Sequence, residues 1–420
     1  MNSKKTSAIL IIFLLLISII LVPYFLGNAN RSITKSVTLE AIDYDTYLID
    51  GVPYISQETN FYCSYAAITM IFNYYKRNTS LDEILYSSGV GYSLLYQRSY
   101  GLTFQHLFSG GYLLCQNINE QEFLASLFAL SYEIWHPDLT STSDSEYWHE
   151  YWPKIKNHIS NDVPVITSVD PYSIPYLREK LNSDDFHGGH ALVLVGFNES
   201  NNTVCYNDPA AGLWNDEENG TYVYLSQDIF RGAVQNTTGT KYVISVYLND
   251  SSTLPMSKEQ RFQKAHERNI QKMKGTIGVG PNFRQLLFAH SGINALKTFK
   301  KDLRVGILRR MLTVFIYSKF PVDYTYMPIE KQNASQYLKD IKNSLDDPSL
   351  IDTCNYESLL LQKEANQWDE LNHYFSELYD IGQENRFFQT LLKSVPITLQ
   401  MRTKVNELIS LEKQIIRGPN

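Results

Sequence analysis

Cys63 stands where the sequence changes from polar residues to a helical pattern. Within residues 63–77, apolar side chains recur every three or four positions, which predicts a helix that begins at Cys63. Lys76 and Arg77 are expected in its last turn, where the helix dipole favours cations. A thiol at a helix N-terminus loses its proton more readily, because free N–H groups and aligned peptide dipoles stabilise the thiolate. The predicted chemistry is nucleophilic attack by sulfur, although a buried structural thiol is the commoner role of a lone cysteine.

His190 and Asp208 are the residues expected to assist such a thiolate. Two runs rich in aliphatic and β-branched residues, 190–197 and 203–207, are joined by a polar turn, which predicts a hairpin. If the turn centres near Glu199, the antiparallel register places His190 opposite Asp208. An aspartate there accepts a hydrogen bond from the imidazole, fixes its tautomer and stabilises the imidazolium. The alternatives are a strand-end histidine with satisfied hydrogen bonds and an Asx turn at Asp208.

Gln57 lies six residues before Cys63 and carries a neutral amide donor. Together with the backbone N–H of Cys63, this amide would form an oxyanion hole. His187 is a second candidate base, but it is expected to project from the loop before the strand, so His190 is preferred.

Asp170 and Tyr172 follow a predicted strand at residues 163–169, in a loop punctuated by prolines. Loops at strand ends often line substrate grooves, and these two residues are candidates for that role. Ordinary turn chemistry explains them equally well.

The segments around these residues resemble a known family. The run Gln57–Cys63 followed by a helix, the strand 188–197 that begins Gly-Gly-His, and the tripeptide Asn-Asp-Pro at 207–209 are together similar to the peptidase C39-like branch of the papain-like superfamily. The resemblance covers roughly residues 48–248.

This resemblance implies a role for each candidate residue. Cys63 would be the nucleophile, His190 the general base and acid, Asp208 the orienting group and Gln57 the oxyanion donor. It also implies an α+β, papain-like cysteine peptidase fold, in which an N-terminal helix bears the cysteine and an antiparallel sheet bears the histidine and aspartate.

A second resemblance points to acyl transfer rather than hydrolysis. Residues 80–85 and 164–176 are similar to the N-terminal domain of butirosin biosynthesis protein H, an acyltransferase of the same fold. The helical C-terminal domain associated with that relative is faintly resembled by residues 292–296 and by the helix around Trp368.

The N-terminus carries the clearest targeting signal. Lys4 and Lys5 precede an uncharged, almost wholly apolar run at residues 8–26, long enough for one transmembrane helix. The lysines favour an N-terminus inside the cell and export of the rest. We expect a retained single-pass anchor within residues 1–28, with the catalytic domain on the outer side of the cell membrane. Cleavage after Ala29 would instead release a secreted protein.

Three regions are expected: the anchor or signal at 1–28, a C39-like domain at 48–248 and a helical domain at 256–420. The net charge of -7 is unevenly distributed, because residues 258–319 alone hold 14 Lys/Arg and 3 Asp/Glu. This basic stretch indicates that the two halves meet each other, an anionic substrate or an anionic membrane surface. No nucleic-acid motif accompanies it, so nucleic acid is not expected as a partner.

Neither a metal nor a cofactor is expected, because no Cys-x-x-Cys pair or phosphate-loop spacing occurs. If Cys63 is free, at most one disulfide can join two of Cys115, Cys205 and Cys354.

The expected function is thus that of a membrane-anchored cysteine peptidase or amidase acting on a peptide or another acyl substrate through a thioester. The alternatives are an acyltransferase like butirosin biosynthesis protein H and a binding module that retains the fold without catalysis.

Overall fold

The computed structural model describes residues 39–40, 44–98, 105–109, 118–135, 144–181, 189–214, 216, 220–237, 241–248, 254–277, 289–304, 326–384 and 387–419. Its strands are β1 (Thr46–Leu48), β2 (Leu94–Arg98), β3 (Gln105–Ser109), β4 (Leu130–Trp135), β5 (Val165–Val169), β6 (His190–Asn198), β7 (Thr203–Asn207), β8 (Val223–Ser226), β9 (Val243–Leu248) and β10 (Ala289–Ser291). Its helices are α2 (Cys63–Tyr74), α3 (Leu81–Ser87), α4 (Ile118–Leu127), α5 (Asp144–Ile159), α6 (Pro175–Leu181), α7 (Gln227–Asn236), α8 (Lys258–Lys274), α10 (Ile293–Arg304), α12 (Tyr326–Ile341), α13 (Pro348–Glu384) and α14 (Phe387–Arg417), with 3-10 turns η2 (Pro171–Ser173), η3 (Pro209–Trp214) and η5 (Lys342–Ser344).

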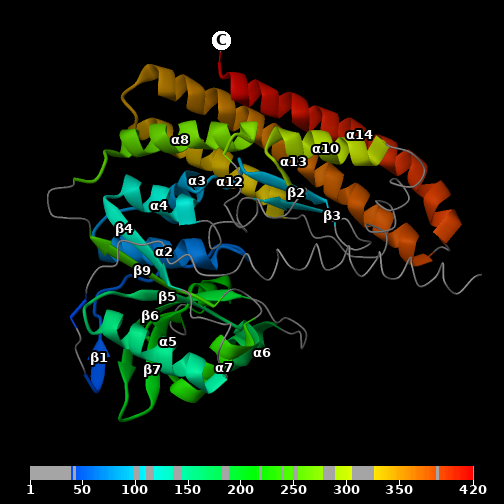
Figure 1. Cartoon of the computed structure of the whole chain (residues 1–420). Coiled ribbons are helices and arrows are strands. Elements are labelled where there is room, and N and C mark those ends of the chain that lie inside the picture. The colour runs from blue at the N-terminus through cyan, green and yellow to red at the C-terminus, as the bar shows by residue number, and fades with distance from the viewer. Residues whose placement is uncertain are drawn as a thin grey trace, which may run out of the picture.

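The main sheet of the described residues has the order β4-β9-β5-β6-β7-β8, with β1 paired to the far part of β6. Every pairing in it is antiparallel. Helix α2 lies on one face, and α5 and α7 lie on the other (Figure 1). Because both faces are covered, β5 is buried along its whole length and β6 along all but its last residue. The predicted α+β class, with an antiparallel sheet followed by a helical region, is confirmed.

The predicted hairpin is present as β6 and β7, which close on the pair Asn198 and Thr203. The expected register is wrong, however. On one side of β6, His190 pairs with Val169 of β5. On the other side, the last residue of β7, Asn207, pairs with Val193, so Asp208 does not lie directly opposite His190.

The position of the turn shifts this register. The hairpin closes on Asn198 and Thr203, so the turn is centred after Glu199 and moves Asp208 away from the position opposite His190. A β-bulge between Leu194 and Gly196 adds a residue to β6 and reverses part of that shift. Asp208 therefore lies just beyond the end of β7, where its side chain reaches His190 diagonally instead of directly across.

Helix α2 ends earlier than the sequence predicts. Its last residue is Tyr74, so Lys76 and Arg77 lie beyond the last turn. Lys76 adopts φ 59°, a left-handed conformation that cannot continue the helix. Two hydrogen bonds between the Asn73 side chain and the backbone of Thr79, both 2.8 Å, close the turn that leads into α3. These contacts stop the helix, and the sequence pattern does not reveal them.

The helices of the C-terminal region cover the side of α3 and α4 that faces away from the main sheet (Figure 1). Trp368, Leu371, Phe375 and Leu378, predicted as a helix core face, are all buried in one cluster. That cluster also contains Leu94 and Tyr96 of β2, while Leu338, Leu361 and Ile415 join the core of the main sheet region. In addition, β10 pairs with β2 in a second sheet of order β10-β2-β3. The helical region and the sheet region thus share both hydrophobic cores.

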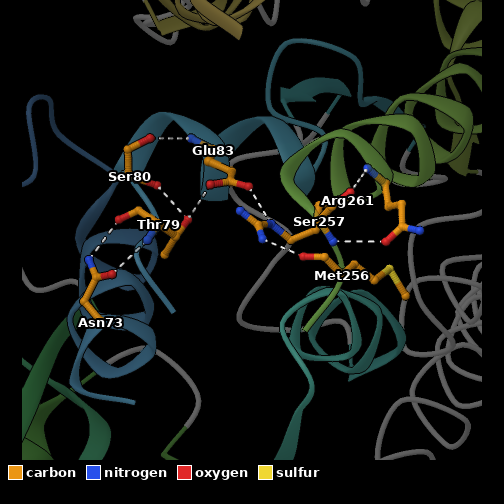
Figure 2. A network of polar contacts seen from close by, with 8 residues as sticks. Asn73, Thr79, Ser80, Glu83, Met256, Ser257 and Arg261 are labelled. Atoms are coloured by element: carbon orange, nitrogen blue, oxygen red, sulfur yellow. Dashed lines mark hydrogen bonds and ion pairs between the residues drawn. The ribbon is translucent and has the colours of Figure 1, made fainter. Parts of the chain in front are cut away.

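Ion pairs from α8 join the two regions, and Figure 2 shows one such network. Arg261 Nε donates to Glu83 Oε1 of α3 at 2.7 Å, and Thr79 Oγ1 donates to the other carboxylate oxygen. Further along α8, Arg268 and Lys272 both bind Glu120 of α4. Much of the excess positive charge of α8 therefore pairs with the acidic first half of the chain. Of the three partners considered for the basic stretch, the structure supports contact between the two halves.

Within the described ranges, no helix combines the length and apolar character needed to cross a membrane. The predicted anchor at residues 8–26 lies outside those ranges, as do His187 and Cys115. Cys205 and Cys354 are both buried and free of disulfides.

Candidate active site

Cys63 is the first residue of α2, as predicted. The preceding residue, Tyr62, forms no side-chain cap, and the first turn contains no acidic residue. Its N–H groups are thus left without a capping side chain and favour negative charge at this end of the helix. The ring of Tyr62 is only 2% exposed, so it anchors the start of the helix while Cys63 stays partly exposed.

His190 and Asp208 form a buried pair beside this helix end. His190 Nε2 donates to Asp208 Oδ1 at 2.7 Å, and the exposed fractions of the two residues are 7% and 1%. The same carboxylate oxygen accepts the backbone N–H of Ala210 at 2.8 Å, within η3. Because Nε2 is engaged with Asp208, Nδ1 is the ring nitrogen left to face the thiol.

Glycine at position 220 is needed to hold Asp208 in this place. The Asp208 backbone N–H donates to the Gly220 carbonyl at 2.8 Å. A Cβ at Gly220 would lie 2.7 Å from the Asp208 carbonyl oxygen, closer than side-chain carbons approach. The close approach of the two backbone segments therefore requires glycine at this position.

The electrostatics of the site favour an ion pair of thiolate and imidazolium. Burial opposes the charge on His190, but the Asp208 carboxylate and its hydrogen bond, with help from Cys63, raise the pKa of His190 to about 10. Burial likewise opposes the Cys63 thiolate, yet the hydrogen bond and charge of His190 bring the pKa of Cys63 below its usual value. Backbone hydrogen bonds from Ala191 and Ser64 act in the same direction.

Gln57 is buried next to the segment that follows Asp208. Its backbone N–H donates to the Pro209 carbonyl at 2.9 Å, which ties the strand-like residues before α2 to η3. The side-chain Nε2 donates to the Thr59 carbonyl at 3.2 Å. Since an amide nitrogen carries two hydrogens, one remains for a further acceptor.

Of the two roles considered for Asp170, the hydrogen bonds of its side chain fit the one in the turn. It is fully buried and caps η2, where Oδ1 accepts the Tyr172 backbone N–H at 3.4 Å and Oδ2 accepts the Ser173 hydroxyl at 2.6 Å. Its carboxylate therefore holds the loop after β5 together.

Some contributors to the site carry no sequence signal. The backbone N–H groups that reach Cys63 and Asp208 belong to Ala191, Ser64 and Ala210, residues whose side chains do no chemistry. Among the residues described, no group of three or more potential metal ligands occurs.

A family model matches part of the chain. Residues 49–229 match the model of a family described as the Peptidase_C39 like family, a range that includes Gln57, Cys63, His190 and Asp208. No curated protein matches the chain significantly.

Proposed function

We propose, on the premise that residues 49–229 belong to the peptidase C39-like family, that this cysteine peptidase-like region is an active thiol enzyme. Cys63, His190 and Asp208 act as its triad, with Gln57 as oxyanion donor. The reaction is hydrolysis of a peptide or another amide through a thioester. The observation that carries this proposal is the buried hydrogen bond of 2.7 Å between His190 and Asp208, next to a thiol whose pKa is lowered.

The first half of the reaction forms the thioester. The Cys63 thiolate attacks the substrate carbonyl carbon, and the carbonyl electrons move to oxygen as an oxyanion. The Cys63 backbone N–H and the second Gln57 Nε2 hydrogen stabilise that oxyanion. When the intermediate collapses, the C–N bond breaks, and the His190 imidazolium gives its proton to the departing amine. Asp208 keeps the imidazole oriented throughout.

The second half releases the acyl group. Neutral His190 takes a proton from the acceptor, whose oxygen or nitrogen attacks the thioester carbonyl, and the C–S bond breaks to restore the thiolate. With water as acceptor the product is an acid, whereas with an amine the product is a new amide. The acyltransferase alternative thus differs only in the acceptor.

We favour hydrolysis because of the proposed location. The uncharged run at residues 8–26 after two lysines supports a single-pass anchor with the triad outside the cell membrane. Carrier-bound acyl groups are not expected there, whereas water and peptides are. Fractionation of cells that express the full chain tests the anchor: the protein should stay in the membrane fraction after high-salt washing. Recovery of a shorter, soluble form would indicate cleavage after Ala29.

Alkylation kinetics test the triad itself. The rate of iodoacetamide incorporation at Cys63 is measured between about pH 5 and pH 10 in the native protein and in His190→Ala, with Cys63→Ser as the background for the other thiols. The native protein should react well below the ordinary thiol range, and His190→Ala should move the midpoint up to that of a free cysteine, about 8.5. Identical profiles in the two proteins would leave Cys63 as an ordinary thiol and support the non-catalytic binding module.

A further inference from the structure

Phe61, two residues before Cys63, combines two unfavourable features. Its backbone φ is 77°, in the left-handed region that bulky side chains avoid. Its ring is 40% exposed, although it belongs to the most apolar residue class. The turn at this position needs a positive φ, and glycine or asparagine would supply it at lower cost. The turn alone therefore explains the backbone conformation but not the phenyl ring.

Among the described residues, the Phe61 ring contacts an aromatic residue of the helical region. Tyr326, the first residue of α12, lies edge-on to it, with ring centroids 5.8 Å apart and planes at 66°. Tyr326 is itself only partly buried. The two rings thus form a partly exposed aromatic pair built from segments 265 positions apart, and one of its members is two residues from the thiol.

Contacts further along α12 hold this pair in place. Asn333 Nδ2 donates to the Tyr62 hydroxyl at 3.4 Å, so the helix touches the residue between Phe61 and Cys63. Gly91, in the left-handed region, lets the chain after α3 approach α12 so closely that a Cβ there would lie 2.7 Å from the Glu330 carbonyl oxygen. Helix α12 is thereby fixed against the loop that precedes the nucleophile.

We propose that Phe61 and Tyr326 form a binding surface for a large apolar group of the substrate, preferably an aromatic one, next to the carbonyl that Cys63 attacks. This inference rests on the proposed function of Cys63 and adds a substrate class to it. A strained, exposed aromatic residue persists where the surrounding structure imposes it and where it serves a purpose. An aromatic pair with open ring area offers edge and face contacts to a further ring. The helical region then contributes directly to substrate choice.

Two alkylating probes with the same reactive group test this surface. The rate constants for Cys63 with 2-iodoacetamide and with N-benzyl-2-iodoacetamide are each divided by the rate constant for glutathione. In the native protein the benzyl probe should be favoured about fivefold, the size expected for an added aromatic contact. The preference should disappear in Phe61→Gly and Tyr326→Ala and persist in Tyr326→Phe.

Phe61→Gly is the informative variant because glycine adopts the same φ without strain, so the fold is kept while the ring is removed. The matched control is Tyr44→Ala. Tyr44 is another exposed aromatic residue, 44% exposed and stacked on Tyr47 with centroids 5.1 Å apart, and it precedes β1, which pairs with the end of β6 far from His190. This variant should retain the native preference.

The proposal is wrong if the native protein shows no benzyl preference, or if the preference survives in both Phe61→Gly and Tyr326→Ala. The same ratio is measured in His190→Ala at about pH 9, where an unassisted thiol is largely ionised. There the preference should remain although the activation is lost. A thiol that proves unactivated in the native protein would thus overturn the proposed function, while the ratio still decides on the aromatic pair.

Discussion

Two buried pairs of imidazole and carboxylate in this molecule have opposite electrostatic outcomes. In the candidate site, His190 is bonded to Asp208 at 2.7 Å and the pKa of His190 rises to about 10. In the core between α3, α8 and α13, His266 Nε2 lies 3.6 Å from Glu357 Oε1 and burial lowers the pKa of His266 to about 4. A neighbouring carboxyl group therefore goes with a raised imidazole pKa in one place and a lowered one in the other.

The difference lies in what else binds each carboxylate. Asp208 Oδ1 accepts the backbone N–H of Ala210 as well as the His190 hydrogen. Burial raises the pKa of Glu357 to about 8, because the Tyr92 hydroxyl offsets only part of the desolvation and Glu364 adds further negative charge. A carboxyl that keeps its proton offers His266 no charge to pair with. The short hydrogen bond to Asp208 thus raises the pKa of His190, whereas the longer contact with a carboxyl group of raised pKa does not raise the pKa of His266.

The largest expected effect comes from Asp208→Asn. Without the carboxylate charge the pKa of His190 falls, because burial then acts unopposed. Activity should drop by about 10³ to 10⁴, as expected when the orienting acid of a triad is lost. The measurement is the rate of Cys63 acylation by an activated ester. The control is the matched change in the other pair, Glu357→Gln, which should leave the acylation rate within about twofold of the native rate. An equal loss of rate in both variants would show that general destabilisation is responsible.

The pH profile of the native site should reveal the same ion pair. The pKa of the thiol is lowered and that of the imidazolium is about 10, so both groups are charged between these limits. Acylation by an amide substrate should therefore fall about tenfold per pH unit at pH values below the pKa of the thiol. It should fall again above about pH 10, where His190 loses the proton it must donate to the departing amine. A profile that rises through pH 10 without a second limb would contradict a raised His190 pKa.

The core pair should affect stability instead of activity. Glu357 keeps its proton in the folded state up to about pH 8, whereas its ordinary pKa is 4.5. The unfolded state therefore releases this proton first, and stability falls as the pH rises from about 4.5 to about 8. Glu357→Gln removes this dependence, so its Tm should exceed the native value by about 4 °C at pH 9 and match it near pH 4.5. Thermal unfolding followed by circular dichroism measures both.

Tyr92→Phe should give the smallest effect. The Tyr92 hydroxyl donates to Glu357 Oε2 at 2.9 Å, and its loss should cost about 1 kcal/mol of unfolding free energy. The pKa of Glu357 should rise further, because this hydrogen bond lowers it. Urea unfolding measures the cost, with Tyr44→Phe as the control at an exposed ring. No change in stability would mean that solvent replaces the hydroxyl, and the core pair would then not be closed to water.

Much of the candidate site could be predicted because its residues lie at the ends of elements that short sequence patterns reveal. The start of α2 at Cys63 and the hairpin of β6 and β7 follow from periodicity over short stretches. The register of the hairpin could not be predicted, since neither the exact position of the turn nor the bulge between Leu194 and Gly196 leaves a periodic pattern in the sequence. The prediction placed His190 opposite Asp208, and the contact exists only because the carboxylate reaches diagonally from beyond β7.

Sequence alone determined the residue types that can carry thiol chemistry, their order along the chain and the secondary structure that presents Cys63 and His190. Only the tertiary structure decided which charges they hold, because the pKa of a buried group depends on donors and carboxylates brought from distant segments. It also decided that Tyr326 of the helical region meets Phe61, two residues before Cys63. Contacts between positions so far apart produce no periodic pattern in the sequence, because tertiary packing and not local propensity determines them.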